Sequence, residues 1–419
     1  MVDRASWSWE VGSRPISSLV EVRETYAAVH ELVVSPDGER IAAPVLAAPD
    51  AFRVCVNGAT WEDEFEKAWH LVFLPDGRLT ALVRIDDEWT VAVDGVPWEE
   101  RWEFAWNTTA SRDGSVIAVQ VKDNMQYTVA VNGVPWVQRF HSSRGLTVGD
   151  GKVAAVVQTV PLSEGDTVGF MGGTWTVAVN GVPWDRNFIN VYSPAIRPDG
   201  ARVGAQVRLD ICDYTLAEDG RTWDRRFGAV WEPVYRPSGE MIAPVRLAGS
   251  WTLAENGTPI WDGRYMQLWN QRIGPDGRRL AAVAATGFGS WTVVVDDRPW
   301  KLEVSDLVLP PVFSPDGGRL AAALRDADRW TIAVDGILWP ETFDMVWDPV
   351  FDPSGSRVLA KVERDGRYAV AVDGRVSGPW YERLWPPVPS PEGDRLLLRV
   401  VEDGVYTRKV VPLASTVLR

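Results

Sequence analysis

A short turn motif recurs ten times along this chain and limits its fold more than any other feature. The fullest copy runs from Pro311 to Trp339 and reads Pro-Val-Phe-Ser-Pro-Asp-Gly, Arg-Leu-Ala-Ala-Ala-Leu and Trp-Thr-Ile-Ala-Val-Asp-Gly before a final tryptophan. The turn glycine returns at intervals of 39, 37, 37, 49, 39, 38, 40, 38 and 38 residues. Its positions are Gly38, Gly77, Gly114, Gly151, Gly200, Gly239, Gly277, Gly317, Gly355 and Gly393. A fixed period of this size indicates a repeat architecture, in which each unit buries its core against its neighbours.

Each repeat contains four β-strand patterns. In the copy at 61–98, runs rich in apolar and β-branched residues at 69–74, 79–83 and 89–93 are separated by turn residues such as Asp94-Gly95, and a fourth run opens at 96. No segment keeps a helical period. We therefore predict an all-β fold, a β-propeller of about ten four-stranded antiparallel blades. A single ring is the preferred arrangement; two five-bladed rings are the alternative, because propellers usually have about four to eight blades.

The chain ends suggest how the last blade is completed. Residues 1–17 lie outside the repeat and are expected to form an N-terminal arm, whereas 18–419 form the propeller. The run 19–23 has the spacing of a fourth strand with no first three strands before it, so it is predicted to close the last blade. The alternative is that Ser415 to Leu418 do so.

The chain contains 23 tryptophans, and most occupy three fixed positions of the repeat. Two sets, at the starts of the third and fourth strands, are expected to pack between blades, where bulky rings fill a wedge-shaped space. The third set lies where the chain enters the innermost strand, near one mouth of the channel. Its members are Trp69, Trp106, Trp231, Trp269 and Trp347. They are candidates for gripping a peptide or sugar, although inter-blade packing explains the same residues.

Two segments depart from the repeat. The fourth repeat has a glycine-rich insertion within residues 160–174, which carries Phe170 and Met171. This loop is either tolerated decoration or a docking element. The N-terminal arm carries Trp7 and Trp9, which are candidates for packing on the propeller or on a partner.

Charge and motif content argue against several classes of function. The formal net charge is −14, which disfavours binding to nucleic acid or anionic lipid. The two cysteines and three histidines have no metal-ligand spacing, and no catalytic motif is present, so we expect no cofactor, metal site or catalytic residue. No apolar run approaches 18 residues and the N-terminus has no signal-like stretch, so no membrane span and a cytoplasmic location are expected.

Two resemblances follow from these motifs. The Ser-Pro-Asp-Gly-x-Arg-Leu-Ala pattern at Ser314–Ala321 resembles the WD40-like repeats of TolB-type propellers, which implies a fold and little else. The Trp-Thr-Val-Ala-Val-Asp/Asn-Gly-Val-Pro-Trp module at Trp89–Trp98 and Trp175–Trp184, with the tryptophan content and acidity, resembles the tryptophan-rich subunit of the transmembrane redox complex of sulfate-reducing bacteria. That resemblance implies a cofactor-free subunit on the cytoplasmic side, whose partners are iron–sulfur and membrane cytochrome subunits. It supplies no catalytic residues.

Two functional hypotheses remain open from the sequence. In the first, the protein is a non-catalytic scaffold in a membrane-associated electron-transfer complex and docks partners through the third tryptophan set, the 160–174 loop and the arm. In the second, it is a stand-alone propeller that binds or acts on a glycan or peptide at the channel mouth.

Overall fold

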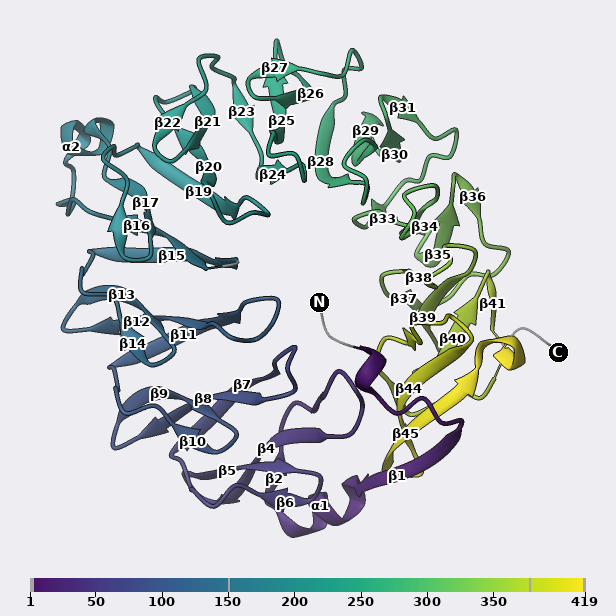
Figure 1. Cartoon of the computed structure of the whole chain (residues 1–419). Helices are drawn as coiled ribbons and strands as arrows, with labels where there is room; N and C mark the ends of the chain where they lie inside the picture. Colours follow the sequence, from purple (N-terminus) through teal and green to yellow (C-terminus); the bar gives the residue numbers. More distant parts are fainter. Residues whose placement is uncertain (1–3, 150, 377, 417–419) are drawn as a thin grey trace. The chain divides into compact units, whose positions relative to one another are not determined.

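The computed structural model describes residues 4–149, 151–376 and 378–416 (Figure 1). These residues form ten antiparallel sheets, as expected for propeller blades. Nine sheets consist of strands that are consecutive in the chain, and the tenth adds a strand from the N-terminal region to the last strands of the chain. The predicted all-β propeller of ten four-stranded antiparallel blades is confirmed. The chain divides into two compact units of five blades: unit 1 comprises Glu66–His70 and Leu74–Tyr265, and unit 2 comprises the chain up to Phe65, Leu71–Phe73 and the chain from Met266 onward.

Unit 1 holds the blades built from β7 to β27, apart from Leu71–Phe73 at the end of β7, with one short helix, α2 (Thr167–Gly172). Its strands are β7 (Lys67–Phe73), β8 (Leu79–Ile85), β9 (Glu88–Val93), β10 (Val96–Pro97), β11 (Phe104–Ala110), β12 (Ile117–Asp123), β13 (Gln126–Val131), β14 (Val134–Pro135), β15 (Ser142–Gly149), β16 (Lys152–Gln158), β17 (Trp175–Val179), β18 (Val182–Pro183), β19 (Asn190–Ile196), β20 (Val203–Arg208), β21 (Tyr214–Glu218), β22 (Arg221–Thr222), β23 (Ala229–Val230), β24 (Val234–Tyr235), β25 (Met241–Leu247), β26 (Ser250–Glu255) and β27 (Thr258–Pro259).

Unit 2 holds the remaining five blades and both described chain ends. Its strands are β1 (Gly12–Ser18), β2 (Ala28–Val29), β3 (Val33–Val34), β4 (Ile41–Ala48), β5 (Ala51–Val56), β6 (Ala59–Thr60), β28 (Gln267–Ile273), β29 (Leu280–Gly287), β30 (Ser290–Val295), β31 (Arg298–Pro299), β32 (Leu307–Val308), β33 (Val312–Phe313), β34 (Leu320–Asp326), β35 (Arg329–Val334), β36 (Ile337–Leu338), β37 (Met345–Val346), β38 (Val350–Phe351), β39 (Val358–Arg364), β40 (Arg367–Val372), β41 (Arg375–Val376), β42 (Arg383–Leu384), β43 (Val388–Pro389), β44 (Arg395–Glu402) and β45 (Val405–Pro412). Its helical segments are η1 (Arg4–Ser6), α1 (Leu19–Thr25) and η2 (Leu413–Thr416).

The strand that completes the last blade is not the one predicted. β1, at Gly12–Ser18, pairs with β45, in a register that runs from Gly12 opposite Val410 to Ser18 opposite Val405 (Figure 1). Residues 19–23, predicted as the closing strand, lie in helix α1. The arm outside the sheet is therefore shorter than residues 1–17. Of the alternative closing segment, Ser415 and Thr416 lie in η2, and Val417 and Leu418 lie outside the described residues.

The sequence of α1 fits a helix for a local reason. Leu19 and Val22 are buried while Val20 is 45% exposed, so the burial follows a spacing of three residues rather than the alternation of a strand. The Ser18 hydroxyl also accepts a hydrogen bond from the backbone N–H of Glu21 at 3.2 Å, which caps the helix N-terminus. The five residues of the predicted run, 19–23, are too few to distinguish the two periods in the sequence.

The hairpin that follows the third strand is locked by its Asp or Asn residue. Asp94 and Gly95 both have positive φ, 45° and 89°, as a tight two-residue hairpin requires. The Asp94 carboxylate also accepts a hydrogen bond at 2.9 Å from the backbone N–H of Leu79, the first residue of β8. Asn132 binds Ile117 in the same way at 2.8 Å. The acidic or amide side chain therefore joins the hairpin to the middle of its blade.

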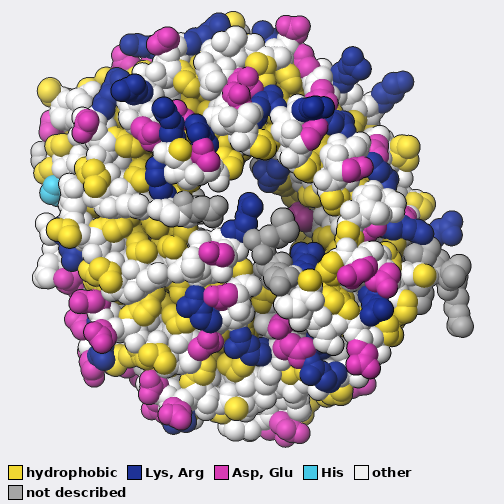
Figure 2. Space-filling view, viewed as in Figure 1, with side chains coloured by type: hydrophobic (Ala, Val, Ile, Leu, Met, Phe, Trp, Pro, Cys, Tyr) yellow, Lys and Arg dark blue, Asp and Glu magenta, His cyan; other side chains and the backbone are white. Residues whose placement is uncertain are grey.

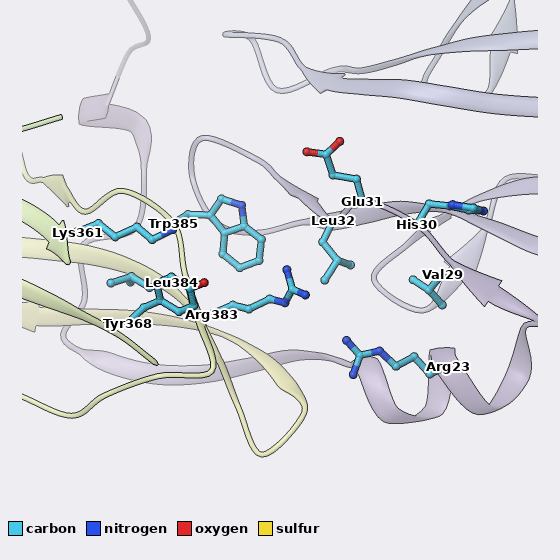
Figure 3. Close-up of a pocket in the computed structure, with 10 residues that line it drawn as sticks. All are labelled: Arg23, Val29, His30, Glu31, Leu32, Lys361, Tyr368, Arg383, Leu384 and Trp385. Atoms are coloured by element: carbon cyan, nitrogen blue, oxygen red, sulfur yellow. The ribbon is translucent and has the colours of Figure 1, made fainter. Parts of the chain in front are cut away.

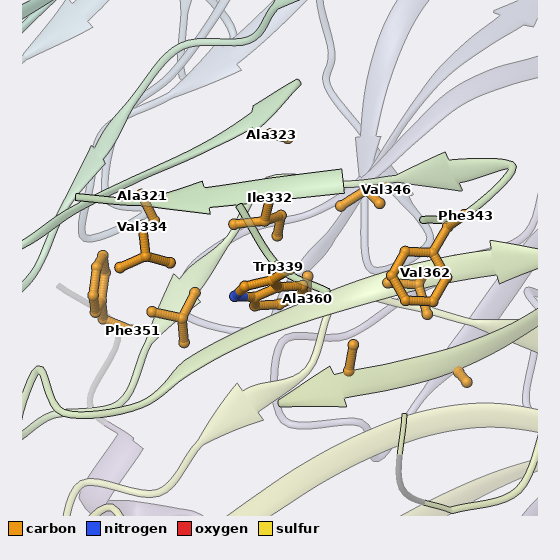
Figure 4. Packing of buried hydrophobic residues seen from close by; sticks show 13 residues of the cluster. Ala321, Ala323, Ile332, Val334, Trp339, Phe343, Val346, Phe351, Ala360 and Val362 are labelled. Atoms are coloured by element: carbon orange, nitrogen blue, oxygen red, sulfur yellow. The ribbon is translucent and has the colours of Figure 1, made fainter. Parts of the chain in front are cut away.

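The fourth-strand tryptophans pack on the next blade within a unit. A Cβ added to the hairpin glycine Gly181 would lie 3.1 Å from the ring of Trp136, and one added to Gly374 would lie 2.9 Å from Trp339. Glycine is therefore required at this hairpin position for two reasons: its φ is positive, and an indole ring packs directly against it. Small and branched apolar side chains complete the joint between β35 and β39, where Ile332 and Val334 belong to the same buried cluster as Ala360 (Figure 4).

The first strand of a blade takes one of two forms. In β11, β15, β19 and β28 it is continuous, and the register against the second strand shifts beside a residue with positive φ such as Asn107 or Gly145. In the pairs β2/β3, β23/β24, β32/β33, β37/β38 and β42/β43 it is split into two short strands. Four of the five splits contain a proline that has no N–H to donate to the ladder: Pro233, Pro311, Pro349 and Pro387.

Candidate functional site

The third tryptophan set forms aromatic pairs within its own blades. Each member lies against the aromatic residue that opens the third strand of the same blade. The ring-centroid distances are 5.4 Å for Trp69–Trp89, 5.9 Å for Trp106–Tyr127, 5.4 Å for Trp231–Trp251, 4.8 Å for Trp269–Trp291 and 5.8 Å for Trp347–Tyr368. Trp69 and Trp231 keep 46% and 37% of their surface exposed. Pairing within the blade therefore accounts for one face of each ring, and a contact role stays a prediction.

The N-terminal arm is held by the last blade of unit 2. Trp7 and Trp9 stack with their ring centroids 6.0 Å apart, and both are half-buried. The Arg395 guanidinium donates a hydrogen bond to the Trp9 carbonyl at 2.6 Å, and Arg408 donates one to the Ser8 carbonyl at 2.5 Å. The arm is thus bound to its own chain by two arginines.

The insertion in the fourth repeat presents an apolar surface from a braced base. Helix α2 leaves Val168, Phe170 and Met171 exposed by 83%, 37% and 40%. The Asp166 carboxylate caps the helix by accepting from the backbone N–H of Gly169 at 2.8 Å. At the base of the insertion, Gly173 has a φ of 85°, and a Cβ there would lie 2.8 Å from the backbone of Phe188. Only glycine fits this close approach, so the return of the loop to its blade is fixed.

A cavity of about 270 Å³ lies in unit 2, lined by residues of three consecutive blades and α1 (Figure 3). Arg23 comes from α1, Lys361 and Tyr368 from β39 and β40, Arg383 and Leu384 from β42, and Trp385 follows β42 directly. The remaining lining residues, from β2 and the segment after it, are Val29, His30, Glu31 and Leu32. The walls combine apolar and aromatic side chains with three side chains that carry positive charge.

Lys361 is the most constrained cation of this cavity. Its Nζ lies 3.7 Å from the ring centroid of Trp347 and 4.5 Å from that of Tyr368, so the ammonium is held between two aromatic faces. Burial lowers the pKa of Lys361 to about 8, Glu363 acts in the opposite direction, and Arg383 lowers it further.

The sequence interpretation left Trp385 and His30 out of the third tryptophan set, although they occupy the same place in the repeat. Each tryptophan of the third set lies eight residues after a fourth-strand tryptophan, as Trp347 does after Trp339, whereas Trp385 is only five residues from Trp380. Both residues do lie eight positions before a turn glycine, Gly393 and Gly38, as Trp347 does before Gly355. Counting from the turn would have found them, because the turn fixes the register of the first strand.

The described residues contain no group of three or more His, Cys, Asp or Glu side chains placed to hold a metal ion. Cys55 is buried and Cys212 is exposed, and both are free thiols. Within the described ranges, no helix has the length and apolar character needed to cross a membrane.

Comparison with known proteins gives likeness in structure only. No protein-family model matches the sequence, and no curated protein matches it. A solved eukaryotic initiation factor is 14% identical, with 81% of this chain and 98% of that chain covered and a TM-score of 0.45. The Dos1 propeller is 10% identical, with coverages of 74% and 92% and a TM-score of 0.39. TolB from Acinetobacter baumannii is 13% identical, with coverages of 73% and 78% and a TM-score of 0.30. At these identities the likeness concerns the fold alone.

Proposed function

We propose that this protein is a non-catalytic interaction subunit that docks a partner protein through the α2 insertion. The observation that carries the proposal is the exposed apolar surface of Val168, Phe170 and Met171 on a loop whose base is fixed by Gly173. An interface gains most from apolar side chains that are already ordered before binding, because less conformational entropy is then lost. The insertion groups three such side chains on one short helix, α2.

The partners that we propose are the iron–sulfur and membrane cytochrome subunits of a membrane-associated redox complex, met on its cytoplasmic side. The support is the resemblance of the Trp89–Trp98 and Trp175–Trp184 modules to the tryptophan-rich subunit of such a complex. On this proposal the subunit holds redox partners together and contributes no cofactor of its own.

The experiment is affinity capture of the full chain from gently solubilised native membranes, followed by mass spectrometry and a haem stain. A variant with Phe170→Ser and Met171→Ser is compared with Phe288→Ser, which removes an aromatic ring that is 99% exposed between β29 and β30. Wild type and Phe288→Ser are expected to recover the same partners in fixed ratio. The α2 variant is expected to lose them, since small polar residues leave little apolar surface to bury.

The two levels of the proposal fail separately. Recovery of a fixed-ratio partner without haem or iron–sulfur protein would leave the interaction role and reject the redox complex. Equal recovery by the α2 variant would reject docking through the insertion. Recovery of the protein alone would reject both.

A further inference from the structure

The cavity of unit 2 gathers three cationic side chains that take part in no salt bridge of the described residues. Among the described residues, Arg23, Lys361 and Arg383 form no ion pair, although the chain as a whole has a net charge of −14. Other arginines of the same blades are paired, as Arg357 is with Asp373 at 2.8 Å and Arg364 with Glu341 at 3.1 Å. Figure 2 shows acidic and basic side chains mixed over the visible surface. The three cations that line this cavity therefore lack the carboxylate partner that Arg357 and Arg364 have.

The side chains converge on a common space. In Figure 3 the guanidinium groups of Arg23 and Arg383 extend toward each other from α1 and β42. The indole of Trp385 lies beside them and the side chain of Leu32 faces it, whereas Glu31 extends away from the two guanidinium groups. Like charges repel each other, so an anion between the two arginines would remove an unfavourable interaction.

A second cavity of unit 2 gives an internal contrast. It has a volume of about 310 Å³ and is lined by Arg14 and Arg408 beside β1. Both arginines pair with Glu39, Arg408 at 3.0 Å. That cavity already contains its anion in the form of a protein carboxylate. The cavity at Arg383 has the same kind of cations, and its one lining carboxylate, Glu31, points elsewhere.

We propose that the cavity between α1, β39 and β42 binds a small ligand that carries a carboxylate or phosphate group on a flat apolar ring. Arg23 and Arg383 bind the oxyanion, for which the guanidinium group has matching donors. Trp385 and Leu32 contact the ring. Lys361, held by its aromatic neighbours at the other side, adds charge and a donor. This inference is independent of docking through α2.

The size of the cavity supports a ligand with one ring. Pockets for drug-sized molecules measure about 300–1,000 Å³, and this cavity, at about 270 Å³, lies below that range. An acid with one aromatic ring fits such a volume, while a dinucleotide does not. The aromatic wall favours a flat group over a sugar ring, because stacked rings gain dispersion and quadrupole interactions.

The test is titration calorimetry of the full chain at low salt with benzoate and with phenyl phosphate, which distinguish the two oxyanions. Benzyl alcohol and inorganic phosphate serve as the ring alone and the anion alone. The variant Arg23→Gln with Arg383→Gln is compared with Arg53→Gln with Arg226→Gln, a control that removes two exposed, salt-bridged arginines elsewhere. Both double variants change the net charge equally.

We expect at least one aryl anion to bind wild type and the control with a Kd of about 1 mM or lower. The Arg23/Arg383 variant should bind it about tenfold or more weakly, since hydrogen bonds to charged groups are the strongest kind. Benzyl alcohol and inorganic phosphate should bind more weakly than the aryl anion. The proposal is overturned if neither aryl anion shows saturable binding, if the double variant binds equally, or if benzyl alcohol binds as tightly.

A second measurement does not depend on any variant. Acetylation of Lys361 by an activated ester, followed by peptide mass spectrometry, should slow in the presence of the bound aryl anion and not with benzyl alcohol. Unchanged acetylation of Lys361 at saturating aryl anion would place the ligand elsewhere and overturn the proposal.

Discussion

The residue of the second strand that pairs with the first-strand tryptophan is a neutral amide in a blade of unit 1 and a cation in a blade of unit 2. In unit 1, Gln120 lies opposite Trp106, donates to the Ser143 hydroxyl at 2.7 Å and accepts from the Asn107 side chain at 2.9 Å. In unit 2, Lys361 occupies this position beside Trp347. The neutral amide closes a hydrogen-bonded network inside the protein, whereas the ammonium has aromatic faces but no anion. One position of the repeat thus has a structural role where it holds glutamine and is a candidate binding position where it holds lysine.

In the next blade of unit 2, the same position of the second strand holds an arginine, whose charge has a structural role. Arg399 follows Lys361 in the repeat, is 9% exposed, and donates to the backbone carbonyls of Pro386 and Ser35 at 2.8 and 3.3 Å. Its charge is used to join the last blade to the first blade of the unit. Within the described residues the Lys361 side chain donates to no backbone carbonyl, so its ammonium group is available to a ligand together with Arg23 and Arg383.

The largest loss of stability is expected for a substitution in the last blade, which β1 completes, compared with the same substitution in an ordinary blade. Tyr406 and Tyr127 open the third strand of their blades, but Tyr406 is fully buried and donates to the Gly38 carbonyl at 3.0 Å, whereas Tyr127 is half-buried. Tyr406→Ala should lower the free energy of unfolding by about 3–5 kcal/mol, and Tyr127→Ala by clearly less. Urea unfolding followed by circular dichroism measures both. Equal losses would show that the closing joint is no more tightly packed than an ordinary blade.

The second effect concerns the amide network of unit 1. Gln120→Leu fills a similar volume but leaves the polar side chains of Asn107 and Ser143 without their partner. We expect a loss of about 1–3 kcal/mol in the free energy of unfolding. The loss should be the same from pH 7 to 9.5, because no group of the network titrates there. A loss that changes steeply with pH in that interval would contradict the neutral network.

The smallest effect is a change in how steeply the free energy of unfolding rises with pH. Burial lowers the pKa of Lys361 from 10.5 to about 8, with Glu363 and Arg383 as the charged groups that act on it. Between these values the unfolded chain binds a proton that the folded chain lacks, so stability rises with pH. Below pH 8 Lys361 is protonated in both states and the folded state bears the full cost of burying its charge. Lys361→Met should therefore show a flatter rise in unfolding free energy from pH 7.5 to 9.5 than wild type; parallel curves would refute the shifted pKa.

Much of the fold was predictable because the same short turn and hairpin motifs recur along the chain, and each motif favours the same local backbone conformation. The Asp94-Gly95 type of hairpin and the turn glycines predicted four strands per blade, since positive φ is available to few residues. The segment 19–23 was predicted wrongly because its few residues fit both strand and helix periods, and the strand that pairs with β45 lies just before it. Pairing between chain ends about 400 residues apart leaves no periodic signal.

The candidate site was predictable only in part. The repeat register identified Trp347 but not Trp385, whose spacing from the preceding tryptophan is shortened. Nothing in the order of residues relates Arg23 to Arg383, since they meet only through the packing of α1 against the last blade.

The sequence by itself determined the blade, its turns and the number of repeats, because these depend on residues close together in the chain. The tertiary structure alone decided which residues outside the repeat pattern come into contact. It brings together the cations of the cavity at Arg383 and places the arginines that bind the arm. It also sets Gly173, at the base of the α2 insertion, against the backbone of Phe188. Charges act through space rather than along the chain, so their chemistry appears only when distant segments are brought together.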